Sequence, residues 1–187
     1  MEIKEILNLK GILGIVSNYK SNLALSGLVC DLKIKNINKA LKIVGLDDTF
    51  LQKNIDDLTD SELWKLELAT KLEKDVIVVG NLYNTLIYKD REYMKKLFIK
   101  LNSTYNKKIV IIDNNVNSFI NVVSKIIVVK KKKIIFETCD FFDEKLYEYV
   151  KMPKIVEFIK YVNKNNKRVD NTLDIYELIK DIYRRVS

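Results

Sequence analysis

The sequence predicts an α/β protein with a mostly parallel sheet flanked by helices, followed by a small helical appendage. Two observations lead to this fold class. Between residues 58 and 137, short runs of β-branched residues alternate with segments of helical periodicity, and from residue 143 onward only helical periodicity remains. At 187 residues, with 48% apolar and 31% charged residues, the chain is long enough for one domain with a substantial core.

The first half of the chain is expected to hold one or two strands and three helices. Residues 3–16 are rich in apolar side chains and end in Ile15 and Val16, which favours a strand there. A turn over residues 17–21 precedes the expected helices, which cover residues 22–28, residues 38–44 with Gly45 as the C-cap, and a segment from Thr59 or Asp60 through Leu72.

The most distinctive strand signal is the run from Val76 to Val79. Four consecutive β-branched residues between Asp75 and Gly80 indicate a central parallel strand that is covered on both faces. The segments expected after it are a helix at 90–101, a strand at 109–112, a helix at 116–123, a strand at 126–129 and a turn at 130–133 that leads into 134–136.

The tail is expected to be a separate helical unit. Ile155, Val156, Ile159 and Val162 form one apolar stripe at helical spacing. We therefore predict an α/β domain at residues 1–139 and a helical, dimerisation-like extension at residues 140–187.

The composition excludes several classes of function. There is no histidine, which rules out Ser-His or Cys-His catalysis and histidine metal sites, and the two cysteines are far apart. No apolar run approaches the ~20 residues of a membrane span, and the N-terminus lacks a signal-peptide layout, so we expect a cytoplasmic protein. The net charge of +8 is weak support for an acidic partner.

Five blocks between Leu58 and Glu137 resemble, in order and spacing, the motifs of ABC transporter ATP-binding subunits. They are Leu58-Thr-Asp-Ser-Glu62 for the signature, residues 64–72 for the helix after it, Asp75 to Leu86 for Walker B and the D-loop, Lys108 to Asn115 for the H-switch, and residues 124–137 for the last strand pair. The resemblance implies a P-loop NTPase fold. Residues 149–156 and 171–179 resemble the C-terminal helices of energy-coupling factor transporter ATPases, which contribute to pairing of two ATPase subunits.

The segment that resembles Walker A departs from the family pattern. A phosphate-binding loop needs glycines so that backbone N–H groups can approach the phosphates, together with Lys and Ser or Thr. The segment from Gly14 to Ser21 keeps Gly14, Lys20 and Ser21, but Ser17 and Tyr19 stand in place of the other two glycines. A relic loop is the preferred interpretation. The alternatives are a working cradle, a shortened loop with Gly14 inside the strand, or a helix opened by Lys20 and Ser21.

The other motifs have lost their chemical groups as well. Where the family has the Walker B aspartate and glutamate for magnesium and the attacking water, this chain has Gly80 and Asn81. Asn114 replaces the H-switch histidine. In the signature, Thr59 stands beside Asp60 and Ser61, which replace the two glycines that approach the partner's nucleotide. The segment from Lys20 to Leu58 is also much shorter than in the family, which implies loss of the region that stacks the adenine.

Two charged clusters have competing interpretations. Lys130, Lys131, Lys132 and Lys133 form either a solvated hairpin turn, which the family alignment favours, or a nucleic-acid patch. Asp56, Asp57, Asp60 and Glu62 are more typical of a helix N-terminus than of a cation site, so we expect no metal site.

These patterns predict a catalytically inactive, ABC ATPase-like protein that acts through protein contacts and needs no cofactor. Its expected partner is a second copy of the chain or an active ATPase subunit, in a complex that could be peripheral to a membrane. The alternatives are a basic nucleic-acid-binding protein built on the same scaffold, or a weak ATPase completed by a partner subunit.

Overall fold

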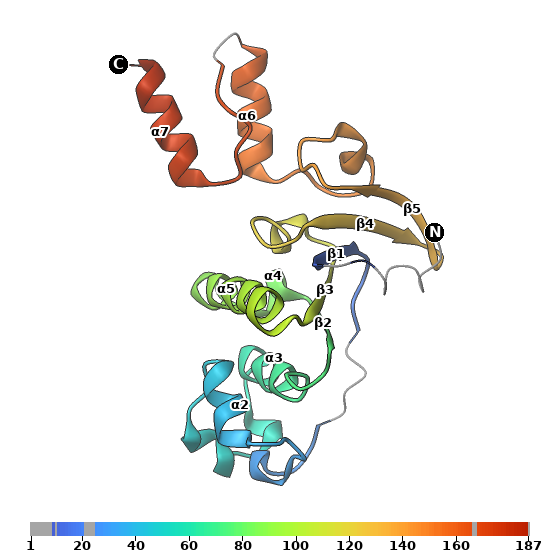
Figure 1. Ribbon diagram of the computed structural model, residues 1–187, viewed down its shortest axis with the longest axis vertical. Coiled ribbons are helices and arrows are strands. Elements are labelled where there is room, and N and C mark those ends of the chain that lie inside the picture. The colour runs from blue at the N-terminus through green and yellow to red at the C-terminus, as the bar shows by residue number, and fades with distance from the viewer. Residues whose placement is uncertain (1–8, 10, 21–24, 166–167, 187) are drawn as a thin grey trace.

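A computed structural model describes residues 9, 11–20, 25–165 and 168–186 of the chain. It contains a five-stranded sheet in the order β2-β3-β1-β4-β5, in which β5 alone runs antiparallel to its neighbour (Figure 1). The strands are β1 (Ile12–Val16), β2 (Val76–Gly80), β3 (Lys108–Asp113), β4 (Lys125–Lys130) and β5 (Lys133–Thr138). The predicted mostly parallel sheet flanked by helices is confirmed.

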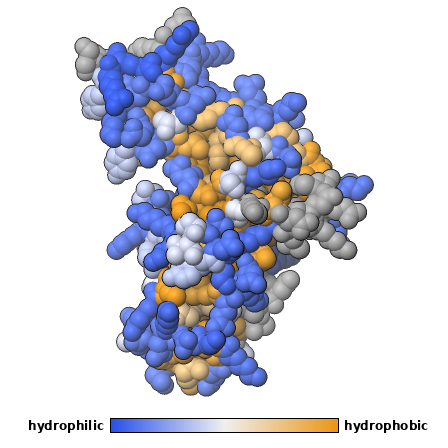
Figure 2. Space-filling view, viewed as in Figure 1, coloured by the Kyte–Doolittle hydropathy of each residue, from blue (hydrophilic) through white to orange (hydrophobic). Residues whose placement is uncertain are grey.

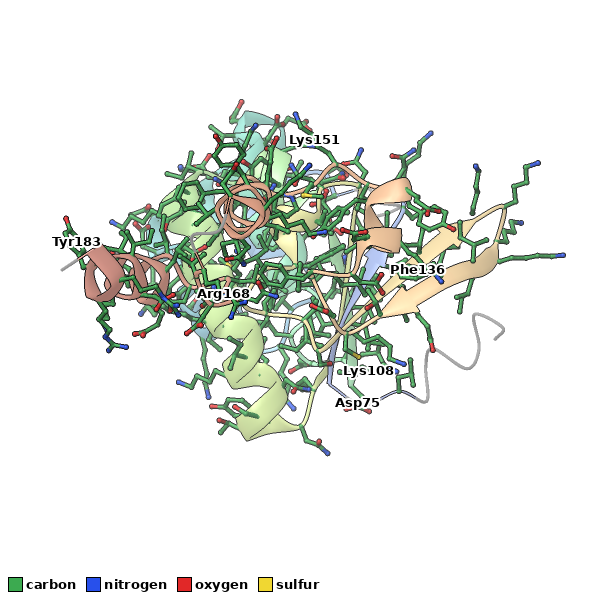
Figure 3. All side chains as sticks on the ribbon, turned by 90° about the horizontal axis from the view of Figure 1, so that it is seen from above. Asp75, Lys108, Phe136, Lys151, Arg168 and Tyr183 are labelled. Atoms are coloured by element: carbon green, nitrogen blue, oxygen red, sulfur yellow. The ribbon has the colours of Figure 1, made fainter. Side chains whose placement is uncertain are left out.

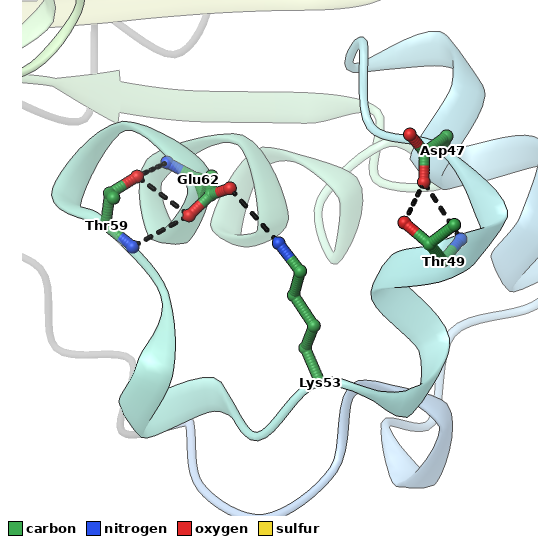
Figure 4. A network of polar contacts seen from close by, with 5 residues as sticks. All are labelled: Asp47, Thr49, Lys53, Thr59 and Glu62. Carbon is green, nitrogen blue, oxygen red and sulfur yellow. Dashed lines mark hydrogen bonds and ion pairs between the residues drawn. The ribbon is translucent and has the colours of Figure 1, made fainter.

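The helices predicted at residues 38–44, 59–72 and 90–101 are present, and each begins within two residues of the predicted start. The α-helices are α2 (Ile37–Ile43), α3 (Asp60–Ala69), α4 (Leu82–Thr85), α5 (Tyr88–Tyr105), α6 (Lys154–Lys164) and α7 (Ile175–Val186), and the 3-10 turns are η1 (Val29–Asp31), η2 (Asp48–Gln52), η3 (Ile55–Asp57), η4 (Val116–Ser118) and η5 (Glu144–Glu148). Gly45 has a φ of +76° just after α2, as a C-cap glycine requires. At the start of α3, Thr59 and Glu62 form a reciprocal capping box (Figure 4).

The main core lies between one face of the sheet and the helices α3 and α5, and it continues to α2, which packs on the side of α3 away from the sheet (Figure 1). Alternate residues of the strands, such as Ile77, Ile109 and Ile111, point into it and are fully buried. Leu13 and Ile127 lie in a second, smaller cluster of strand side chains, which Leu9 also joins. Helical cover therefore concentrates on one face.

The prediction that Val76–Val79 forms a central strand is wrong, because β2 is the edge strand of the sheet. Val76 and Val78 remain partly exposed. The outward carbonyls of this edge are not left open: Trp64 Nε1 donates to the Gly80 carbonyl at 2.7 Å, and Lys71 Nζ donates to the Val78 carbonyl at 2.9 Å. Trp64 of α3 and Lys71, two residues beyond the end of that helix, thus satisfy a strand edge that another strand would otherwise pair.

Two predicted helices are not found among the residues that the structure describes. Residues 22–24 of the helix expected at 22–28 lie outside the described residues, and residues 25–28 are not helical: Gly27 has a φ of +85° and Leu28 forms an antiparallel bridge with Asn54. The helix expected at 116–123 is reduced to η4, because Asn115 caps a tight turn there and Asn121 takes a φ of +60°, which a right-handed helix cannot continue through.

The turn between β4 and β5 is a two-residue hairpin, as predicted. Lys131 and Lys132 occupy its central positions with φ values of +49° and +62°, so both are in the left-handed region that this type of turn requires. Lysine adopts that conformation at a cost that glycine or asparagine would avoid. The register of the hairpin is fixed by pairing of Lys130 with Lys133.

The tail consists of α6 and α7, which lie together at one end of the molecule (Figure 1). Ile159, Val169 and Leu178 form a small cluster of their own, whereas Phe141 and Leu146 before them belong to the main core. Seen from the same side, Figure 2 shows apolar residues toward the middle of the molecule and mostly hydrophilic residues at its outer ends. Among the described residues, no helix has the length and apolarity to cross a bilayer.

Candidate functional site

The carboxyl ends of β1, β2 and β3 meet at one edge of the sheet, where open α/β folds place their ligands. The chain leaves β1 through Asn18 and Tyr19, leaves β2 through Gly80 and Asn81, and leaves β3 through Asn114. Tyr19, Gly80, Asn81 and Asn114 are positions that the sequence singled out, whereas Asn18 is not. The structure brings them together through the contacts described next.

Gly14 lies in the middle of β1, paired with Ile111 on one side and Ile126 on the other. A Cβ at this position would lie 2.9 Å from the ring of Phe119, so the glycine lets that ring pack against the sheet. The geometry agrees with the alternative in which Gly14 belongs to the strand. Lys20 is exposed, and Ser21 lies outside the described residues.

The ring of Tyr19 lies directly over Gly80. A Cβ built on Gly80 would stand 2.1 Å from Cγ and 2.4 Å from Cβ of Tyr19, which is far inside van der Waals contact. The space that a side chain at position 80 would need is therefore filled by a residue of the loop after β1. Any residue other than glycine at position 80 requires Tyr19 to move.

Tyr19 is held in this position by polar contacts with α3. Its hydroxyl donates to Glu67 Oε1 at 2.9 Å and accepts from Lys71 Nζ at 3.2 Å, and Lys71 also pairs with Glu67. Burial raises the pKa of Tyr19 above 10.0, and the hydrogen bond from Lys71 acts in the opposite direction. Glu67 and Lys71 were not predicted as site residues; the signal that the sequence offers for them is their i,i+4 spacing.

The loops after β2 and β3 hold the same segment by amide contacts. Asn81 Nδ2 donates to the Tyr19 carbonyl at 3.3 Å, and Asn114 Nδ2 donates to Asn18 Oδ1 at 3.4 Å. Asn81 has a φ of +55°, which asparagine tolerates better than most residues. The residues at the Walker B and H-switch positions thus contact the chain that follows β1.

Asp113, at the end of β3, is fully buried and was not identified from the sequence as a site residue. Its carboxylate accepts from the Ser118 hydroxyl at 2.6 Å, from the Asn115 backbone N–H at 3.0 Å and from the Tyr83 backbone N–H at 3.4 Å. These three donors compensate the cost of burying the group. Asp113 ties the start of α4 to the loop that contains η4.

The signature positions lie at the N-terminus of α3. Thr59 caps the helix, Asp60 is exposed, and the Ser61 hydroxyl donates to Asp90 at 3.3 Å. The hydrogen bond that the Thr59 backbone N–H donates to the Glu62 carboxylate lowers the pKa of that carboxyl below 4.5, although burial opposes the shift. Lys53 contacts Glu62 from the preceding turn (Figure 4). These residues form a helix start, as one of the sequence interpretations predicts.

Neutral side chains occupy the positions after β1, β2 and β3, while charged groups lie next to them: Glu67 and Lys71 at the Tyr19 hydroxyl, and Asp113 buried at the end of β3. The side chains that meet there are the Tyr19 phenol and the amides of Asn18, Asn81 and Asn114. Within the described part of the chain, no group of three or more His, Cys, Asp or Glu residues is placed to hold a metal ion.

The lysine cluster singled out in the sequence lies elsewhere. Lys131, Lys132 and Lys133 are exposed on the hairpin between β4 and β5.

Comparison with known proteins gives structural neighbours only. No family model matches the chain, and no curated protein matches it. Among solved structures, CbiO1 from Clostridium perfringens, part of the ABC transporter complex CbiONQ, is similar with a TM-score of 0.51 at 20% identity over 87% of this chain and 67% of that one. The bacterial ABC transporter cassette MJ0796, in its dimeric structure, gives a TM-score of 0.46 at 21% identity over 54% of this chain and 44% of that one.

A second dimeric structure of MJ0796, bound to ADP and Pi, gives a TM-score of 0.48 at 18% identity over 74% of this chain and 68% of that one. The chain therefore spans between 44% and 68% of the length of these three structures. At such identity the likeness concerns the fold alone. The protein has an ABC ATPase-like, P-loop NTPase fold.

Proposed function

We propose that this protein is a catalytically inactive, ABC ATPase-like scaffold that works through protein contacts in the cytoplasm. The observation that carries the proposal is the placement of the Tyr19 ring over Gly80. In the resemblance drawn above, position 80 belongs to a carboxylate that serves magnesium. Here the chain after β1 fills that space.

The contacts around Tyr19 support the same conclusion. A phosphate cradle needs free backbone N–H groups and an open approach to them. The loop after β1 is instead held by two hydrogen bonds. The Tyr19 hydroxyl donates to Glu67 of α3, and the side-chain amide of Asn81, just after β2, donates to the Tyr19 carbonyl. Opening it for a nucleotide would break both contacts and expose the ring of Tyr19.

The surface of the tail supports a role in protein contacts. One side of α7 buries Leu178, while large apolar or aromatic side chains stay exposed on the tail helices. We call these exposed residues the tail surface: Phe158, Tyr161, Ile175, Tyr176, Ile179 and Tyr183. Aromatic residues are enriched where proteins meet, because they bury large areas and keep a polar end in water. Tyr183 lies on the outer side of the molecule in Figure 3.

We infer that the partner is a second copy of the chain or an active ATPase subunit of an ABC-type complex. CbiO1 is itself part of such a complex. The resemblance of residues 149–156 and 171–179 to pairing helices favours this partner class over nucleic acid. A second copy is the first partner to test, because it needs no other component.

Calorimetric titration with ATP and magnesium, together with a thermal shift, tests the inactive site. A ligand that binds the folded state at a hundredfold excess over Kd stabilises it by about 2.7 kcal/mol. We expect neither heat nor a shift at millimolar ATP, and we expect no release of phosphate. An active ABC ATPase serves as the positive control. Saturable binding of ATP that requires the loop after β1 would overturn the proposal.

A further inference from the structure

A pocket opens beside the carboxyl end of β3, and of the residues that hold the loop after β1 it shares Asn114. It has a volume of about 540 Å³ and lies between the loop of η4 and the start of α6. The residues that line it are Tyr83, Asn114, Asn115, Asn117, Lys151, Met152 and Lys154. Pockets of this size, about 300–1,000 Å³, are typical of small-molecule sites.

The charge of the lining is one-sided. Lys151 and Lys154 contribute two ammonium groups, and no carboxylate is among the lining residues. Lys154 pairs with Glu157 at 2.8 Å, but both side chains are largely exposed, so this contact competes weakly with a ligand. The hydrogen bond from Lys154 and, to a smaller extent, the positive charge of Lys151 (labelled in Figure 3) lower the pKa of the Glu157 carboxyl, but Glu157 is not among the lining residues. The pocket is therefore suited to an anion.

The remaining lining residues indicate the shape of that anion. Asn115 and Asn117 are held together by a hydrogen bond of 2.8 Å from the Asn117 side-chain amide to Asn115 Oδ1. Lysine ammonium groups act as point charges and can contact oxygens from several directions, whereas planar carboxylates are matched best by the fork of arginine. A lining with two lysines and three asparagines suits a tetrahedral group with several acceptor oxygens, and a phosphate fulfils this requirement.

The pocket also offers a wall for the organic part of a ligand. The ring of Tyr83 is fixed by Arg91, whose guanidinium lies 4.5 Å from the ring centroid and donates to the Tyr83 carbonyl at 3.1 Å. Met152 adds a flexible apolar side chain to the same lining. We propose that this pocket binds a small phosphate monoester, with the phosphate between Lys151, Lys154 and the asparagine amides. The site goes beyond the proposed function, which it does not require.

Titration of the full-length protein with ribose 5-phosphate, followed by NMR of backbone and Asn amide signals, tests the site. Inorganic phosphate and succinate at the same ionic strength are the comparison ligands. We expect saturable shifts at Asn114, Asn115, Asn117 and residues 151–154, with tighter binding of the ester than of phosphate. Absence of saturable shifts, or equal binding of succinate, would overturn the proposal.

The Lys151→Gln/Lys154→Gln double variant should weaken binding of the ester by roughly tenfold or more, because two charges next to a dianion are removed. Lys164→Gln is the matched control, since it removes an exposed charge from the far end of α6, and it should leave binding unchanged. Equal affinity in the double variant and the parent would contradict the site. ATP binding that survives the double variant would count against the proposed function and not against this pocket.

Discussion

At the scale of single residues, Tyr19 and Gly80 determine the character of the carboxyl edge. The ring needs a neighbour without a side chain, and the glycine provides it. The Tyr19 hydroxyl is also hydrogen-bonded to Glu67 and Lys71. The side chain is therefore held both where it packs on Gly80 and at its hydroxyl. The two residues are far apart in sequence and should behave as one energetic unit.

Gly80→Ala should lower the free energy of unfolding by about 1–3 kcal/mol, because the new Cβ collides with the Tyr19 ring and the backbone must shift. The backbone of Gly80 is not in the left-handed region, so the collision is the main cause. In a Tyr19→Ala background the same change should cost little. Urea unfolding of the parent, both single variants and the double variant measures this coupling.

A coupling free energy of about 1 kcal/mol or more between the two positions is expected. Additivity of the two single changes to within about 0.5 kcal/mol would show that Tyr19 does not contact Gly80 in solution.

The sequence allowed several of these residues to be predicted as altered motif positions. Tyr19, Gly80, Asn81 and Asn114 were identified by spacing. Their mutual contacts were not predictable, because they depend on where the loop after β1 turns. The role of Gly14 shows the same limit: a glycine before a polar loop is compatible with a phosphate loop, and only the position of Phe119 shows why the strand needs it.

At the scale of elements, α3 does more than cover the sheet. It lies against the free edge of β2, where Trp64 and Lys71 bond to the outward carbonyls of Gly80 and Val78. An unpaired strand edge invites association with other chains unless it is protected. The helix therefore replaces a neighbouring strand for part of this edge.

Trp64→Phe should destabilise the protein by about 1–3 kcal/mol, because it removes the bond to the Gly80 carbonyl and part of the buried indole. Native-state hydrogen exchange should also become faster at β2 amides than at β3 amides. Phe98→Leu is the control. The ring centroids of Phe98 and Trp64 lie 6.5 Å apart in the same core, but the phenylalanine side chain has no polar group that could hydrogen-bond to β2. If both variants accelerate exchange at β2 equally, the bond to Gly80 does not protect the edge.

Most elements were predictable from periodicity, and the errors have physical causes. A run of β-branched residues indicates a well-packed strand, but it does not indicate which strands lie beside it. For this reason β2 was wrongly predicted to be a central strand. The helix expected at 116–123 failed because Asn115 and Asn121 favour local turns over the helix. In contrast, the start of α3 was predicted correctly at Thr59 or Asp60, and the structure shows why the signal is local: Thr59 and Glu62 form a capping box within one turn.

At the scale of the whole molecule, the protein combines a closed sheet edge with a tail that exposes large apolar side chains. The tail cluster around Ile159 and Leu178 is small, so the tail helices bury little of their own surface. A second chain that covers the tail surface would add to this core. The proposed division at residue 140 is a prediction that fits such an arrangement.

Tyr176→Ser/Ile179→Ser should weaken self-association at least tenfold, because both side chains are exposed on α7 and a paired surface would bury them. Analytical ultracentrifugation across a concentration series measures the effect. Tyr105→Ser, at the exposed end of α5, is the control and should leave the dissociation constant unchanged. A parent protein that stays monomeric at high concentration would exclude a second copy as the partner and direct the search to an ATPase subunit.

The placement of Tyr19 over Gly80 also constrains the order in which mutations can be accepted. A carboxylate introduced at position 80 meets the ring at once, and the destabilised protein is a poor intermediate for selection. Tyr19 must first become small, a change that by itself gives up the bonds to Glu67 and Lys71. Gaining a carboxylate at position 80 therefore requires an intermediate of lower stability, and the packing of one aromatic ring restricts which residues this position can accept.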